Sequence, residues 1–302
     1  MSDNLHRPAV QHKLNPSEIL GKLNHYLLDS FKQIKDISRC AVLFSGGVDS
    51  SLAAVLTKKQ CEETLLITAR CDNSYDAKAS VRAAKTMSID MIEVRIDSDS
   101  LWQALPDVIR SIGQSKRMDV EIAIPFYFAA REAKKREFSV MVSGQGPDEL
   151  FGGYARYEKI MIEQGPEEVE AALWRDVSVT DKANIQRDAR VLCHHGLQPF
   201  FPYLYPDFVN LALSIPATLN IDPTKKPARK LMFRQLAMKM GVPKEIAMEQ
   251  KRATQYSSGT SKMLIESMRD NFRSFRNLSK REIQSAMQES LDQINHQQSM
   301  EE

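Results

Sequence analysis

A glycine-rich loop directly after a short aliphatic strand is the feature that most restricts how this chain can fold. Residues 41–44 (Ala-Val-Leu-Phe) predict a buried strand, and residues 45–51 (Ser-Gly-Gly-Val-Asp-Ser-Ser) follow at once and open a helix predicted to reach residue 59. Two consecutive glycines let the backbone approach a ligand closely, and a helix N-terminus attracts anions. The hydroxyls of Ser45, Ser50 and Ser51 add hydrogen-bond donors. The segment predicts a phosphate-binding loop, with a capped Gly-Gly turn as the purely structural alternative.

An acidic residue distinguishes this loop from other phosphate-binding loops. It lacks the G-x-x-x-x-G-K-[ST] pattern and its lysine, which argues against an ordinary Walker-type phosphotransferase. It carries Asp49 instead. Because a carboxylate repels a polyphosphate unless a cation lies between them, Asp49 indicates Mg²⁺.

Short aliphatic segments alternate with helical patterns over the first half of the chain. Further strands are predicted at 64–68, 91–96 and 138–142, with helices at 16–34, at 76–87 and in two pieces between 99 and 136. This alternation predicts an α/β fold with a doubly wound parallel sheet. No strand is expected after about Tyr154. The expected parts are a packing helix (1–37), an ATP-binding α/β core (38–153), a helical part (154–294, with helices at 155–194, 205–214, 226–240 and 258–294) and a frayed tail (295–302).

The composition excludes several classes of protein. The chain has 302 residues, 42% of them hydrophobic and 26% charged, as folded domains do. Its longest nearly apolar stretch, at 122–130, is far shorter than the roughly 20 residues of a membrane helix, and we expect no signal peptide from its polar start. We therefore expect a cytoplasmic protein. The four cysteines form no C-x-x-C pair and are expected to be buried thiols (Cys40, Cys61, Cys71 and Cys193).

Positive charge is concentrated late in the chain. Residues 225–281 hold 15 Lys and Arg against four acids, so this segment carries +11 although the whole chain carries +2. Such asymmetry marks either a phosphate-rich partner, such as a nucleotide, pyrophosphate or RNA, or the solvated faces of amphipathic helices.

A second glycine-rich segment, at 142–157, follows the last strand predicted in the first half. Its adjacent acids Asp148 and Glu149 are bracketed by four glycines at the carboxyl end of that strand, where open α/β sheets bind ligands. Asp148 is placed to hold the same Mg²⁺ as Asp49 from the opposite side. The alternative is a capped turn that carries surface acids.

These motifs together resemble a known family. The S-G-G-x-D-S loop resembles the pyrophosphate loop (PP-loop) of the ATP pyrophosphatases, and residues 142–157 look like the synthetase-domain motif of glutamine-dependent asparagine synthetases and of the β-lactam and carbapenam synthetases. Segments 119–127, 230–234, 250–252 and 257–259 fit further motifs of that family in order, so the resemblance spans about residues 16–275. It implies an adenine nucleotide alpha hydrolase-like fold and cleavage of ATP between the α- and β-phosphates.

The resemblance also implies roles for individual residues. Asp49 and Asp148 would ligate the metal, and Lys230 would lie near the phosphates. Lys251 would neutralise charge as the α-phosphorus is attacked, which agrees with the negative charge that adenylation builds on phosphoryl oxygens. The remaining positions would hold pyrophosphate (Ser45, Gly46, Gly47 and Ser50) or lie along the nucleotide (Val42, Leu43 and Gly144).

Three positions depart from the family pattern. The glutaminase domain of the family begins with a cysteine nucleophile, whereas Ser2 stands here, so we expect free ammonia, a separate glutaminase subunit or another amine as nitrogen source. Gln145 replaces an acid that is expected to assist the nitrogen nucleophile, and an amide cannot accept a proton at neutral pH. Residues 199–205 lose a positive charge and an acid, and Tyr203 and Tyr205 are expected to shape the acceptor pocket instead.

The predicted function is that of an asparagine synthetase-like ligase. ATP with Mg²⁺ would adenylate a small-molecule carboxylate and release pyrophosphate, and a nitrogen nucleophile would then release AMP. Aspartate and ammonia are the default substrates. The alternatives are amidation or cyclisation of another carboxylate, RNA modification by an adenylating enzyme, and a non-catalytic nucleotide-binding regulator. Nucleic acid and membranes are not expected partners, and a homo-oligomer is left open.

Overall fold

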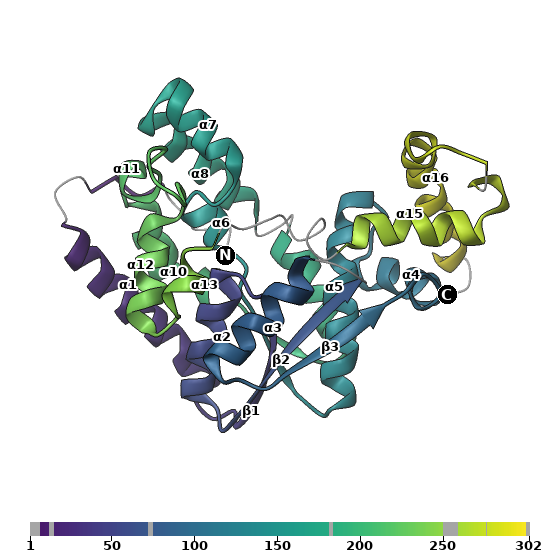
Figure 1. Ribbon diagram of the computed structural model, residues 1–302, viewed down its shortest axis with the longest axis horizontal. Helices are drawn as coiled ribbons and strands as arrows, with labels where there is room; N and C mark the ends of the chain where they lie inside the picture. Colours follow the sequence, from purple (N-terminus) through teal and green to yellow (C-terminus); the bar gives the residue numbers. More distant parts are fainter. Residues whose placement is uncertain are drawn as a thin grey trace.

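A five-stranded parallel sheet forms the centre of the molecule (Figure 1). The computed structural model describes residues 7–11, 15–71, 75–180, 184–249, 259–275 and 277–299. The strands are β1 (Arg39–Leu43), β2 (Glu63–Cys71), β3 (Met91–Ile96), β4 (Val140–Ser143) and β5 (Gln198–Phe200). They lie in the order β3-β2-β1-β4-β5, and every neighbouring pair is parallel. The predicted parallel sheet is confirmed.

The last strand corrects the sequence prediction. No strand was expected after Tyr154, yet β5 pairs with β4 through Val140 and Gln198, Met141 and Pro199, and Val142 and Phe200. Only three residues long and with a proline in the middle, β5 has no alternation that a pattern could detect. Proline is tolerated there because β5 is an edge strand with a single neighbour.

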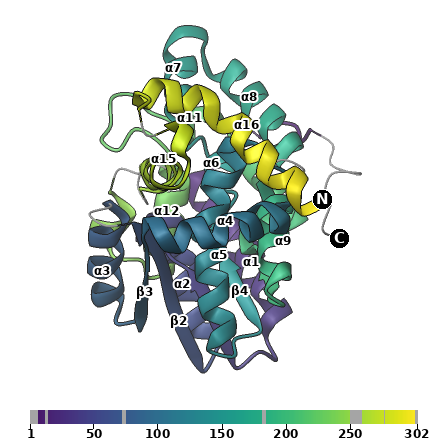
Figure 2. The same ribbon diagram turned by 90° about the vertical axis from the view of Figure 1, so that its right-hand side faces the viewer.

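Helices cover both faces of the sheet, as the doubly wound prediction requires. Successive strand residues point to opposite faces, so Val42 and Val142 enter one hydrophobic core while Ala41 and Met141 enter the other. The first core is built with α1 (Pro16–Phe31), α2 (Val48–Gln60), α3 (Tyr75–Met87), α8 (Pro166–Thr180), α10 (Pro206–Leu213) and α12 (Leu231–Met240). The second is built with α4 (Ser98–Ile112), α5 (Arg117–Lys135), α9 (Gln186–His194), α15 (Thr260–Asn271) and α16 (Lys280–Ser299). Figure 2 shows α4 and α5 lying across the sheet.

Several predicted helices begin or end at other residues. The helical segment predicted at 155–194 contains α7 (Ala155–Gln164), α8 and α9. Gly165, at φ 91°, ends α7, and Pro166 starts α8. The helix predicted at 226–240 begins only at Leu231, because Lys230 adopts a left-handed conformation at φ 57°. The described residues also form short helices, α6 (Pro147–Leu150), α11 (Ala217–Asn220) and α13 (Lys244–Ala247), and the 3₁₀ turns η2 (Lys32–Ile34), η4 (Pro202–Leu204) and η5 (Arg273–Phe275).

The cysteine prediction is correct at three positions and wrong at the fourth. Cys40, Cys61 and Cys71 are buried thiols, whereas Cys193 is exposed near the end of α9. Within the ranges given above, none of the helices combines the length and apolar character needed to cross a bilayer.

Candidate functional site

The two glycine-rich motifs meet at the carboxyl edge of the sheet. The loop after β1 and the loop after β4 leave adjacent strands, which pair up to Leu43 and Ser143. From β1 the chain continues to β2 and β3 on one side of the sheet, and from β4 it continues to β5 on the other side. The direction in which strands are added therefore changes between β1 and β4. Open α/β sheets bind ligands at such a switch point.

Glycine is required where the loops pack. A Cβ on Gly144 would lie 2.8 Å from the backbone N of Ser50, so the second loop lies directly against the start of α2. Gly46, at φ +77°, would place a Cβ 2.6 Å from the backbone of Ala79 in α3. Any larger residue at either position would push two backbone segments apart.

Hydroxyl groups line the first loop. The Ser50 hydroxyl lies 3.2 Å from the Ser45 hydroxyl, accepts a hydrogen bond from the Ser45 N–H at 3.3 Å and donates to the Gly47 carbonyl at 3.2 Å. The Ser51 hydroxyl is buried and has no hydrogen-bond partner among the described residues. Of the residues predicted to border the nucleotide, Val42 has a fully buried side chain, whereas Leu43 is half-buried.

A buried lysine joins the two motifs. The Lys230 ammonium lies 2.8 Å from both carboxylate oxygens of Asp49 and 2.6 Å from Oδ1 of Asp148, and its side chain is 2% exposed. Gly153 makes room for this contact, because a Cβ there would lie 1.9 Å from Oδ1 of Asp148 and 2.2 Å from Cε of Lys230. Three segments far apart in the sequence thus converge on one cationic group.

The two carboxylates fit a magnesium site that is completed by substrate. Asp49 and Asp148 reach the same ammonium, so their oxygens already converge on a positive charge. Within the described residues, no group of three or more His, Cys, Asp or Glu side chains is placed to hold a metal. Mg²⁺ is usually held by one or two carboxylates together with substrate phosphates and water, and the pair Asp49 and Asp148 has that composition.

Neighbouring side chains fix the carboxylate-bearing segments. The Tyr203 hydroxyl is buried and donates to the backbone carbonyl of Asp49 at 2.7 Å. It thereby holds the backbone of Asp49, and its expected place in an acceptor pocket stays a prediction. The Glu149 carboxylate accepts a hydrogen bond from the Tyr154 hydroxyl at 2.6 Å, and burial together with the adjacent Asp148 raises the pKa of Glu149. The Tyr205 ring packs against the first core.

The predicted catalytic Lys251 lies outside the described residues, as do the adjoining 250–258. The residues just before them are held firmly, because buried Arg234 donates to the carbonyls of Ala247 at 2.5 Å and Glu249 at 2.9 Å. The Glu249 carboxylate pairs with Arg82 of α3 at 2.5 Å. Arg234 is the last residue of the motif at 230–234, so this motif places Lys230 and also anchors the chain that leads to Lys251.

Gln145 is held by a residue that the sequence did not reveal. Its amide Nε2 donates to Oδ2 of Asp188 at 2.9 Å, and Asp188 is completely buried at the start of α9. Arg187 pairs with Asp188 at 2.7 Å and with Asp119 of α5 at 2.9 Å. Only the match at 119–127 pointed toward this region, and nothing in the sequence linked residue 145 to residue 188.

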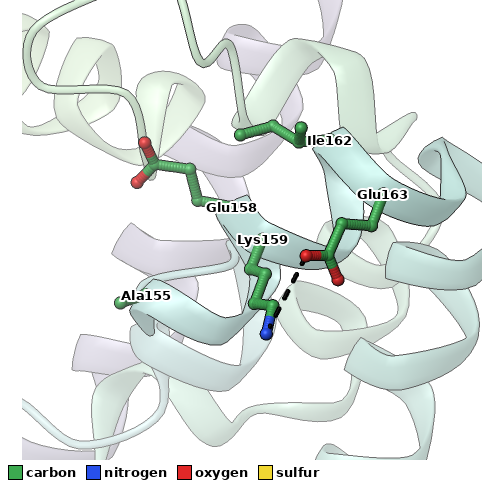
Figure 3. A pocket seen from close by; sticks show the side chains of 5 residues that line it. All are labelled: Ala155, Glu158, Lys159, Ile162 and Glu163. Atoms are coloured by element: carbon green, nitrogen blue, oxygen red, sulfur yellow. Dashed lines mark ion pairs between the residues drawn. The ribbon is translucent and has the colours of Figure 1, made fainter.

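A separate cavity of about 250 Å³ lies along the outer face of α7 (Figure 3). Its lining residues come from that one helix: Ala155, Glu158, Lys159, Ile162 and Glu163. Lys159 and Glu163 pair across it at 3.8 Å. None of the predicted site residues lines this cavity.

Comparison with known proteins identifies the family. The asparagine synthase family model matches residues 22–167 and 161–299. The chain belongs to the asparagine synthase family.

Individual relatives cover the same region. An archaeal protein from Methanocaldococcus jannaschii, provisionally named asparagine synthetase 1 (glutamine-hydrolysing), is 32% identical over 78% of this chain and 48% of its own length. An asparagine synthetase domain-containing protein of Saccharomyces cerevisiae is 28% identical over 82% of this chain and 54% of its own. The chain thus spans about half the length of these relatives. The ammonia-dependent NAD synthetase of Campylobacter jejuni matches 60% of this chain and 92% of its own at 15% identity and a TM-score of 0.33, an overlap that adds nothing to the assignment.

Proposed function

We propose that this chain is an ATP-dependent carbon–nitrogen ligase that adenylates a carboxylate, with aspartate as the default substrate. The observation that carries the proposal is the convergence of Asp49 and Asp148 on Lys230 at the switch point of the sheet. Membership of the asparagine synthase family supports the same reaction class.

The loop after β1 is the proposed pyrophosphate site. Its backbone N–H groups and the hydroxyls of Ser45, Ser50 and Ser51 lie at the N-terminus of α2, where the helix dipole favours an anion. Asp49 and Asp148 would hold Mg²⁺, which when bound neutralises phosphate oxygens. Lys230 then has phosphate oxygens as alternative partners for its ammonium.

The proposed chemistry has two steps. A carboxylate oxygen of the substrate attacks the α-phosphorus of ATP and pyrophosphate leaves, while Lys251 stabilises the charge on the phosphoryl oxygens. A nitrogen nucleophile then attacks the acyl carbon and AMP leaves. Ammonia, supplied free or by a separate glutaminase subunit, is the proposed nitrogen source.

Product analysis tests the proposal. The protein is incubated with ATP, Mg²⁺ and a panel of carboxylates beginning with aspartate, with and without ammonium chloride, and the nucleotides and pyrophosphate are quantified. We expect AMP and pyrophosphate in equal amounts, dependent on one carboxylate, and an amide only when ammonium is present. ADP as the product would contradict cleavage between the α- and β-phosphates.

Matched variants connect that activity to the site. Asp49→Asn and Asp148→Asn should each abolish AMP formation, because each removes a charge that we assign to the metal. Asp36→Asn makes the same chemical change at an exposed position between α1 and β1 and should leave the rate unchanged. Equal rates in all three variants would remove Asp49 and Asp148 from the mechanism.

A further inference from the structure

A buried polar chain leads away from the phosphate site through Gln145. Asp188, with no exposed side-chain surface, accepts the Gln145 Nε2–H at 2.9 Å on one oxygen and the Arg187 Nε–H at 2.7 Å on the other. Arg187 is 2% exposed and continues to Asp119 at 2.9 Å. Both oxygens of the Asp188 carboxylate are therefore engaged, each in a fixed direction.

This arrangement determines which end of the Gln145 amide faces Asp188. An ionised carboxylate only accepts hydrogen bonds, so Asp188 must receive the NH₂ end of the amide. The amide oxygen, Oε1, is then turned away from Asp188, and no hydrogen bond to it exists among the described residues. Gln145 lies between Gly144, which packs on Ser50, and the segment that carries Asp148. The residue that carries this oxygen belongs to the loop that borders the proposed phosphate site.

We propose that Asp188 is a positioning residue for the second step of the reaction. By fixing the Gln145 amide, Asp188 makes Oε1 a neutral hydrogen-bond acceptor. This acceptor would bind a nitrogen nucleophile with N–H groups, either ammonia or a primary amine. The inference rests on the proposed function and adds the binding of the nucleophile. Gln145 orients the N–H bonds and does not take up the proton. A carboxylate at residue 145 would instead face the buried Asp188 carboxylate, and like charges at that distance oppose each other.

The test separates the two steps. Exchange of labelled pyrophosphate into ATP, measured with the carboxylate and without nitrogen, reports adenylation, whereas amide formation at varied ammonium or methylamine reports the second step. Asp188→Asn is informative because Arg187 only donates hydrogen bonds and will pair with the amide oxygen of the new side chain. The NH₂ group of that side chain then faces Gln145. The Gln145 amide should then reverse and present its own NH₂ group to the nucleophile.

The expected outcome is selective for the nucleophile. Asp188→Asn should raise the KM for ammonium about tenfold or more and leave pyrophosphate exchange within about threefold of wild type. Gln145→Glu alone should also impair amide formation. The double variant Gln145→Glu/Asp188→Asn should restore the KM for ammonium, because the new carboxylate can accept from the Asn NH₂ group with one oxygen and present the other. Asp36→Asn and thermal melting curves control for general effects on the fold.

Three results would overturn the inference. Parallel loss of exchange and amide formation in Asp188→Asn would indicate a structural role only. An unchanged KM for ammonium in that variant would mean that the orientation of the amide does not matter. A KM for ammonium in the double variant no lower than that of Asp188→Asn would mean that swapping the donor and acceptor groups between residues 145 and 188 does not restore binding of the nucleophile. These results leave the proposed function standing, whereas a wild-type protein that catalyses neither pyrophosphate exchange nor amide formation removes both.

Discussion

At Lys230 a single ammonium satisfies two carboxylates in a nearly dry site. Lys230→Met keeps the length of the side chain but leaves Asp49 and Asp148 without their shared cation, and both are largely buried. Breaking a buried ion pair in this way costs about 3–5 kcal/mol. We expect a lower melting temperature, and a larger rise of that temperature with Mg²⁺ alone than in wild type, because a divalent cation replaces the missing charge. Thermal unfolding with and without Mg²⁺, in the absence of nucleotide, measures both.

The control for this prediction is Lys35→Met, at an exposed position after η2. It should change neither the melting temperature nor the response to Mg²⁺ by much. If Lys230→Met and wild type respond equally to Mg²⁺, the two carboxylates do not form the metal site.

Residues that carry a local pattern could be predicted from the sequence, and residues that act through long-range contacts could not. Asp49 and Asp148 stand inside glycine-rich motifs after strands, so adjacent strands bring them together. Asp188 stands in an ordinary helical segment, and its contact with Gln145 spans 43 residues. Such a contact depends on how α9 packs against α5, α4 and β5, and the spacing of residues along the sequence does not predict that packing.

At the scale of elements, the strands of the first half were predictable because each is a run of aliphatic or β-branched residues. The edge strand β5 was not predictable, because Gln198-Pro199-Phe200 has no run of aliphatic or β-branched residues and is recognised as a strand only by its pairing with β4. The start of α12 was also misplaced, because Lys230, whose ammonium contacts Asp49 and Asp148, adopts a left-handed conformation that a lysine rarely takes.

The contact between the two loops gives an element-scale prediction. Gly144→Ala should separate the loop after β4 from the start of α2, because the new Cβ would lie 2.8 Å from the backbone N of Ser50. Inserting a methyl group into such a contact costs roughly 1–3 kcal/mol. We expect a lower melting temperature and a weaker affinity for Mg·ATP, measured by thermal unfolding and by nucleotide titration.

Gly21→Ala is the matched control for that substitution. Gly21 is an exposed position within α1, where an added Cβ meets nothing within 4 Å. Alanine there should stabilise the protein by about 0.5–1 kcal/mol, because glycine is a poor helix former, and should leave nucleotide affinity unchanged. An equal loss of affinity in both variants would mean that the contact of the loops is not what binds the nucleotide.

At the scale of the whole molecule, the sheet brings together parts of the chain that the sequence keeps apart. The alternation of elements predicted parallel strands with helices on both faces, and the strand order β3-β2-β1-β4-β5 adds that the two motifs are neighbours. Lys230 arrives from the helical second half and joins them. The proposed nucleotide site thus draws on both halves of the chain, which would not be expected of two independent domains.

A site built from both halves should stabilise the whole molecule when it is filled. A ligand that binds only the folded state at 100 times its Kd adds about 2.7 kcal/mol to the free energy of unfolding, which corresponds to a rise of roughly 5 °C or more in melting temperature. We expect this rise with Mg²⁺ and α,β-methylene ATP, whose α–β bridge resists cleavage, in a single unfolding transition. Asp49→Asn and Asp148→Asn should lose most of it, and Asp36→Asn should keep it. A ligand held between the loops after β1 and β4 depends on both carboxylates and on the intact molecule. A rise in melting temperature that persists in Asp49→Asn, or that affects only one of two separate unfolding transitions, would therefore place the nucleotide elsewhere.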